Sequence, residues 1–157
     1  MAHHRRSATK RGPLLARRRA RLEGPFLGAW VGLVVATRRG WLALSPERAC
    51  LVTLLAFHVF YGSLSAQYLL WVVPLGVLWP GRVLGAHAAA ATAGLVGFYL
   101  FLAPGVLLPQ PLEGPAADWA GRLWVVGVGA TLVVSAAWLS GLLRDGVRAA
   151  RGRAAPV

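Results

Sequence analysis

Long apolar stretches without charge alternate along this chain with short groups of arginine. No Lys, Arg, Asp or Glu occurs between Arg48 and Arg82, from Val83 to Leu112, or from Leu123 to Leu143. A bilayer core about 30 Å thick is crossed by about 20 residues of α-helix, so each run is long enough to span it. Only helices and closed barrels satisfy their backbone in hydrocarbon, and these runs lack the period-two alternation of barrel strands. The pattern predicts an all-α, polytopic transmembrane helical bundle.

Turn and cap residues divide the apolar stretches into five segments. The first, 26–37, is short. The second begins with Ser45 as N-cap, Pro46 at the first helical position and Glu47 in the first turn. Asp118 is expected to cap the last helix. Pro80-Gly81 and Pro104-Gly105 end the third and fourth segments, which places the predicted spans at about 45–61, 65–79, 82–103 and 118–143.

The positions of the arginines favour four spans over five. With segments two to five spanning, the basic stretches 1–24 and 145–157 and the pair Arg38-Arg39 all fall on the cytoplasmic side, as the positive-inside rule expects. Arg122 is then the one basic residue near the outer side. Residues 1–24 are expected to be a disordered basic tail and 145–157 a second basic tail, both cytoplasmic. The first apolar segment, at the start of membrane region 25–144, would lie in the interface or insert only partly.

Composition narrows the possible partners. Hydrophobic residues make up 57% of the 157 residues and charged residues 14%, too few charges to cover a soluble domain. The net charge of +12 comes largely from the N-terminal tail, where no aromatic residue is interleaved with the arginines, so membrane lipids and not nucleic acid are the expected partner. A single cysteine, Cys50, excludes a disulfide framework and a thiolate metal site. No cofactor and no metal are predicted.

Small residues recur at four-residue spacing in the fourth segment, at Gly81, Gly85 and Ala89, and again at Ala90 and Gly94. Such stripes allow helix backbones to approach closely in lipid. Gly127 and Ala130 in the fifth segment are interpreted in the same way, as helix-packing positions.

The most informative stretch runs from His58 to Leu75, where polar and aromatic side chains gather near the predicted outer membrane face. A Gln beside aromatic rings suits the hydroxyls and the flat CH face of a sugar, but it equally suits an aromatic belt with one interhelical hydrogen bond. His58 is expected to be neutral and bonded to a nearby hydroxyl, although an ionisable residue in a membrane helix also suggests function. His87 is given no role. The candidate substrate-binding residues are His58, Ser65, Gln67, Tyr68 and Trp71.

The eleven residues from Ser65 to Leu75, SAQYLLWVVPL, resemble an S-P-Q-Y-L-L-W-L-L-P-L signature of the C-terminal half of GT-C membrane glycosyltransferases. The groups most similar to it are the bacterial glycosyltransferases of family 87 and the glycosylphosphatidylinositol mannosyltransferases. Ala66 departs from the usual proline. The resemblance implies transfer of a sugar from a polyprenyl-phosphate carrier on the extracytoplasmic side, and mannose is the expected sugar.

Enzymes of this kind carry their catalytic acid in the first outer loop of a much longer chain. Glycosyl transfer needs a carboxylate or its equivalent to accept the acceptor's proton. Of the five carboxylates here, Glu113 and Asp118 alone can face outward on the predicted topology. The presence of Glu113 is explained by its position in a loop, and that of Asp118 by its expected role as a helix cap. No catalytic residue is therefore assigned. The chain by itself is expected to lack the chemistry and to need an N-terminal half or another membrane subunit.

Two hypotheses therefore follow from the sequence. The first is the C-terminal membrane portion of a lipid-linked-sugar-dependent glycosyltransferase in a bacterial plasma membrane. The alternative is a small non-catalytic scaffold or assembly subunit that docks larger partners through its Gly/Ala stripe. A transporter fits least, because the sequence shows no inverted repeat.

Overall fold

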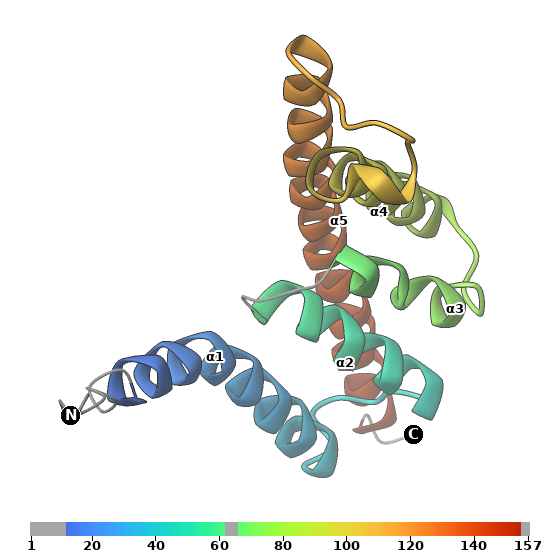
Figure 1. Ribbon diagram of the computed structural model, residues 1–157. Coiled ribbons are helices and arrows are strands. Elements are labelled where there is room, and N and C mark those ends of the chain that lie inside the picture. Colours follow the sequence, from blue (N-terminus) through green and yellow to red (C-terminus); the bar gives the residue numbers. More distant parts are fainter. Residues whose placement is uncertain (1–11, 62–65, 155–157) are drawn as a thin grey trace, which may run out of the picture.

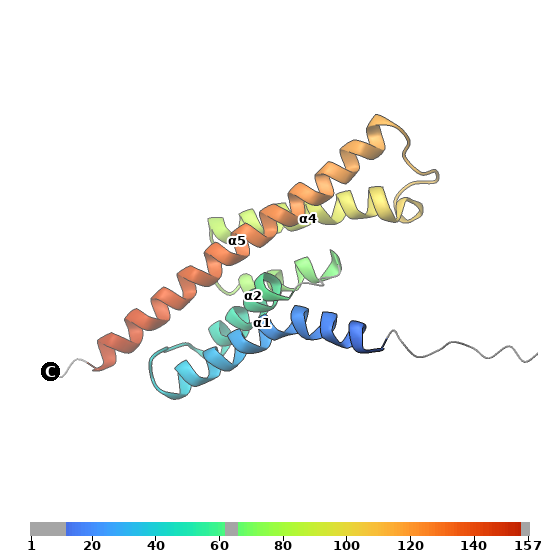
Figure 2. The same cartoon turned by 90° about the vertical axis from the view of Figure 1, so that its left-hand side faces the viewer.

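The structure, a computed structural model, describes residues 12–61 and 66–154 and is helical, with no strand within those ranges (Figure 1). The predicted all-α class is confirmed. Helices α4 and α5 form an antiparallel hairpin, and α1, α2 and α3 lie along one side of α5 (Figures 1 and 2). The elements are α1 (Gly12–Arg38), α2 (Pro46–Phe60), η1 (Ala66–Leu70), α3 (Val72–Gly76), α4 (Arg82–Leu102), η2 (Pro104–Val106) and α5 (Pro115–Ala154).

The α4–α5 hairpin is held by glycines that bring the two backbones into contact. A Cβ atom added at Gly94 would lie 3.0 Å from the Val128 nitrogen, and one added at Gly127 would collide with the backbone of Gly94. Gly97 meets the backbone of Trp124 in the same way. The packing role predicted for Gly94 and Gly127 is confirmed, whereas Gly81 and Gly85 have open space around them.

The start of α2 agrees with its predicted signals. The Ser45 hydroxyl accepts a hydrogen bond from the Arg48 backbone N–H at 3.4 Å, and Pro46 occupies the first turn. At the other end of the chain, α5 begins at Pro115, directly after Gly114, whose φ of 56° favours glycine. Asp118 thus lies in the first turn of α5, and its predicted role as N-cap is wrong. Its carboxylate there still favours the helix through the helix dipole.

The predicted third span, 65–79, is wrong as a continuous helix. The chain forms a 3₁₀ turn over η1, breaks at Trp71, and continues as the short helix α3. Pro74 explains the break, because a proline has no N–H to donate to the carbonyl four residues earlier, that of Leu70. Placed in the first turn of α3, Pro74 is tolerated.

Only two helices in the described ranges, α4 and α5, are long and apolar enough to cross a membrane. The 15 residues of α2 extend about 22 Å, short of a bilayer core of about 30 Å. The four predicted spans are therefore not supported. The apolar pattern of the sequence predicts segments but not whether each one spans. The second segment forms a helix that is too short to cross a bilayer, and the third is broken.

Both basic ends are more helical than predicted. Residues 12–24 belong to α1, and α5 continues through Arg144 to Ala154. Alanine and arginine, joined by leucine in the first stretch, are the commonest residues here and good helix formers, which explains the helicity. With 40 residues, α5 is about 60 Å long, so its arginine-rich end continues beyond the uncharged run.

Helix α1 runs antiparallel to α2. Phe26 contacts the rings of Phe57 and Tyr61, with centroids 5.4 and 6.5 Å apart, while the other end of α1 leads through the loop at Gly40 into α2. The start of α1 and the end of α5 consequently lie at opposite ends of the molecule (Figure 2). The sequence predicted both basic ends on the same side. That prediction used only the positions of the charges, whereas the direction of α1 depends on the aromatic contacts of Phe26.

The hydrophobic core lies where α2, α3 and the C-terminal half of α5 meet. Its buried members are Leu51, Val52, Leu55, Ala56, Val72, Trp138, Leu139 and Leu142. The loop before α2 closes one end, since the Ala43 N–H donates to the Gly146 carbonyl at 3.1 Å. This core fixes α2 and α3 beside α5 and so positions the broken segment described next.

Candidate functional site

The candidate site is built around the break between η1 and α3, where two buried histidines bind backbone carbonyls. The Nε2 atom of His58 lies 2.6 Å from the Tyr68 carbonyl oxygen, and its Nδ1 atom lies 2.9 Å from the Leu54 carbonyl oxygen. Both ring nitrogens of His58 thus face main-chain oxygens, one in α2 and one in η1. The prediction that His58 bonds a hydroxyl is wrong, because both of its contacts are with main-chain carbonyl oxygens.

His87 makes the second contact to this segment. Its Nε2 atom donates to the Leu69 carbonyl oxygen at 3.0 Å, and the Ser135 hydroxyl, 3.3 Å from Nδ1, donates to the other ring nitrogen. Both residues are fully buried. A neutral imidazole satisfies this arrangement with one donor and one acceptor. His87 therefore joins three elements, η1, α4 and α5.

The two histidine rings lie 6.2 Å apart between centroids, although 29 positions separate them in the sequence. Together they bind the consecutive carbonyls of Tyr68 and Leu69, and the Tyr68 carbonyl also accepts a hydrogen bond from the Trp71 N–H at 3.1 Å. Non-helical backbone at membrane depth is tolerated only where protein groups satisfy it. The histidine pair supplies such groups and fixes η1 against α2 and α4.

The position of Ser135 locates the cluster along α5. Counted at about 1.5 Å per residue, Ser135 lies about 18 Å from Leu123 and about 12 Å from Leu143, the two ends of the uncharged run. The cluster is thus level with the middle of this run. The candidate residues were predicted near the outer end of the spans, whereas His58 lies beside His87 at this middle level.

An aromatic group borders the same segment. The Tyr68 and Trp71 rings pack with centroids 4.4 Å apart, and Tyr68 also lies 6.1 Å from Phe57. Trp71 is 53% exposed, whereas Tyr68 is half-buried. Tyr68 and Trp71 therefore present one exposed indole beside a tyrosine ring.

The structure brings three of the five predicted site residues together, namely His58, Tyr68 and Trp71. Gln67 lies in η1, but its side chain falls outside the described residues, as does the whole of Ser65. Because η1 is a 3₁₀ turn, Gln67 does not share an α-helical face with Trp71 and Pro74.

Sequence reasoning missed His87 and Ser135. The available signal was that His87 is an ionisable residue inside an apolar run, which marks a functional or structural contact. No local pattern indicates which carbonyl it binds, since the partner lies 18 residues earlier.

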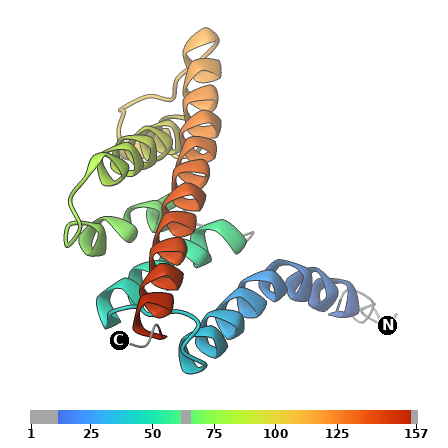
Figure 3. The same ribbon diagram turned by 180° about the vertical axis from the view of Figure 1, so that it is seen from behind.

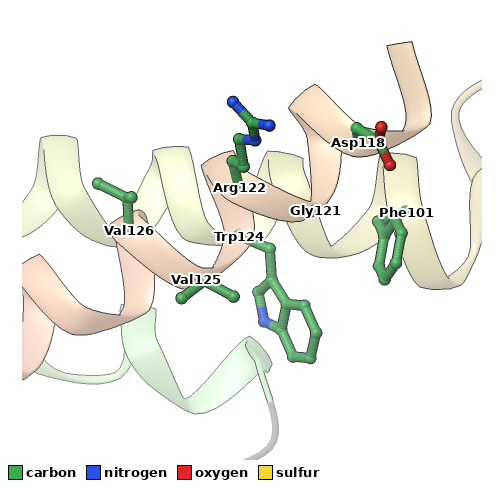
Figure 4. Close-up of a pocket in the computed structure, with 7 residues that line it drawn as sticks. All are labelled: Phe101, Asp118, Gly121, Arg122, Trp124, Val125 and Val126. Carbon is green, nitrogen blue, oxygen red and sulfur yellow. The ribbon is translucent and has the colours of Figure 1, made fainter. Parts of the chain in front are cut away.

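A separate pocket of about 530 Å³ lies near the end of the α4–α5 hairpin where the loop joins the two helices (Figure 4). Phe101 and Trp124 line its apolar part, with ring centroids 6.2 Å apart, and Asp118 and Arg122 supply charge. In Figure 4 the Asp118 carboxylate lies on the side of Phe101 and Arg122 points away from it. Asp118 is thus an exposed carboxylate at a pocket, separate from the histidine pair.

Nowhere in the described ranges do three His, Cys, Asp or Glu residues gather as a metal site would need. Comparison of the chain with family models, with curated proteins and with solved structures finds no match. The arrangement of the site is therefore the basis for a functional proposal.

Proposed function

We propose that this chain is the C-terminal membrane portion of a glycosyltransferase that takes its sugar from a polyprenyl-phosphate carrier. The observation that carries the proposal is the coincidence of two features. The eleven-residue run that resembles the GT-C signature falls on the segment whose backbone is held by His58 and His87. Binding sites need such rigid support of the residues that contact the ligand.

In this proposal Trp71 and Tyr68 contact the flat face of a sugar or the start of the polyprenyl chain, and Gln67 bonds sugar hydroxyls. An exposed indole packed on a tyrosine is suited to that contact, because aromatic faces offer a large apolar surface at low entropic cost. His58 and His87 position the segment and do not touch the substrate. The catalytic carboxylate comes from an N-terminal half or partner subunit, in an outer loop.

The test joins the chain to the polypeptide encoded directly upstream and measures transfer of labelled mannose from polyprenyl-phosphate mannose in membranes. Trp71→Ala should lower the rate about tenfold, since an aromatic contact contributes roughly 0.5–1.5 kcal/mol beyond its buried area. Trp119→Ala is the matched control, because Trp119 is equally exposed, at 58%, but lies on α5 away from η1. Equal rates for the two variants, or no acidic outer-loop sequence upstream in any frame, would contradict the proposal.

A second function, a non-catalytic scaffold, is favoured by one observation. Gly85 and Ala89 are exposed on α4, and a Cβ at Gly85 meets no atom within 4 Å. A stripe with this open space could receive a partner helix. Under this alternative, Gly85→Leu and Ala89→Leu abolish complex formation in co-purification from host membranes, whereas Trp71→Ala leaves it unchanged.

Both proposals place the chain in a bacterial plasma membrane with the arginine-rich end of α5 in the cytoplasm. The charge pattern assigns residues 1–24 to that side as well, whereas the direction of α1 beside α2 favours the opposite side. Alkaline phosphatase fusions, active only outside the cytoplasm, distinguish these placements. Fusions after Val157 should be inactive, and a fusion before Met1 reports whether α1 keeps its packed direction in the bilayer.

A further inference from the structure

An apolar groove of about 410 Å³ separates α1 from α5 and has α2 as its floor. Figures 1 and 3 show α1 leaning away from α5, while α2 lies across α5. Small residues on α1 leave the groove open, since a Cβ at Gly32 meets no atom within 4 Å. Its walls are formed by Gly32 and Ala36 of α1, Val52 and Ala56 of α2, and Leu139 and Leu143 of α5.

A second pocket, of about 400 Å³, adjoins the groove at the C-terminal end of α5. Leu42 lines both, which makes them neighbours. The second pocket is more polar and is lined by Thr37 and Arg153, among others. Trp41, which lines the groove at this end, is 60% exposed and carries the Arg39 guanidinium 5.2 Å from its ring centroid.

The charges at this end are unbalanced. Arg39 and Arg153 stand at the groove end and in the second pocket, and neither pocket is lined by a carboxylate. In the described part of the chain the nearest acidic residue on α5 is Asp145, which pairs with Arg148 at 3.7 Å. Glu47, in the first turn of α2, lines neither pocket. An anionic group next to an apolar chain complements this arrangement.

We propose that the groove between α1, α2 and α5 binds one anionic phospholipid of the cytoplasmic leaflet. An acyl chain lies between Gly32 and Leu143, Trp41 lies at the interface, and the phosphate lies between Arg39 and Arg153. The volume of the groove falls within the range of about 300–1,000 Å³ that small-ligand sites occupy. Exposed Trp and Arg at one level are typical of the membrane interface, where each basic residue attracts anionic lipid. This site is independent of the proposed glycosyltransferase function, because it lies at the cytoplasmic end of α5.

The test is native mass spectrometry of the full chain in detergent, with phosphatidylglycerol and phosphatidylcholine of identical acyl chains added in turn. We expect one phosphatidylglycerol bound per chain, with clearly weaker retention of phosphatidylcholine. Arg39→Gln and Arg153→Gln should each lower phosphatidylglycerol binding about fivefold, the equivalent of about 1 kcal/mol per basic residue. Arg122→Gln, at the other end of α5, is the matched control and should leave binding unchanged.

Gly32→Leu should fill the groove and abolish binding of both lipids. Gly129→Leu is its control, because Gly129 also has open space but lies on α5 outside the groove. Circular dichroism should show that both variants keep their helix content. The two arginine variants test the site without any change in its core. Equal retention of the two lipids by the unsubstituted chain would overturn the proposal. A dimer that only Gly32→Leu dissociates would also overturn it, because a second copy of the chain would then occupy the groove.

Discussion

In the α4–α5 hairpin two backbones touch directly, whereas between η1 and α3 the backbone is held by side chains. Gly94 and Gly127 allow the first contact because neither has a Cβ. The second depends on His58 and His87, which bind the carbonyls of Tyr68 and Leu69. A continuous helix satisfies its own backbone and needs only a close fit, but a broken one needs polar partners from elsewhere. The hairpin is thus a scaffold, and the broken segment is the place where polar groups are concentrated.

This difference predicts that the two regions respond to different substitutions. The hairpin should be sensitive to added volume and insensitive to loss of polar groups. The broken segment should show the opposite behaviour.

The largest effect is expected for Gly127→Ala. Alanine is favoured over glycine in a helix by about 1 kcal/mol, yet here its Cβ collides with the backbone of Gly94, which cannot move independently of α4. We expect a net destabilisation of about 1–3 kcal/mol, measured by denaturant titration of helix content in detergent. Gly129→Ala, two residues further along α5 with open space, should be neutral or stabilising. If both variants behave alike, the hairpin is not close-packed at Gly127.

A smaller and more local effect is expected for His87→Leu. The substitution leaves the buried Leu69 carbonyl without its donor. We expect a loss of about 1 kcal/mol, the lower end of the penalty for such a group, because η1 can relax around the carbonyl. Hydrogen exchange should accelerate in the amides of residues 66–79 while the amides at the Gly94–Gly127 contact stay protected. Thr131→Val is the control, because the Thr131 hydroxyl is also buried but bonds only within α5, to the Gly127 carbonyl. Faster exchange throughout α4 and α5 would show that the two regions are not separable.

The same contrast explains which features the sequence could predict. Local signals placed α2 within one residue of its observed ends, because Ser45 and Pro46 determine the start independently of tertiary contacts. The uncharged run before Pro104 likewise predicted α4, which begins at the expected residue, Arg82. Where the structure depends on nearest neighbours in the chain, pattern reasoning is sufficient.

The break at Trp71 depends on both local and distant residues, and only the local part was available. Pro74 indicates an interruption, but apolar residues on both sides of it look like a continuous span. Whether the chain can break there depends on His87, which the sequence gives no reason to place beside Leu69. The pattern therefore indicated the candidate residues His58, Tyr68 and Trp71, but not the role of His87, which joins their segment to α4 and α5.

The smallest effect is expected for Ser135→Ala, at the junction of the two regions. Its hydroxyl donates to His87 Nδ1 over a long distance of 3.3 Å, and polar contacts between membrane helices average about 0.6 kcal/mol. We expect a loss of that order, measured by the same denaturant titration, with a slight acceleration of exchange in η1 because His87 is then oriented by its Leu69 contact alone. Ser140→Ala is the matched control on the same helix, since the exposed Ser140 hydroxyl bonds only the Ala136 carbonyl. A loss at Ser135 as large as that of His87→Leu would mean that Ser135, and not the histidine ring itself, determines how firmly the broken segment is held to α5.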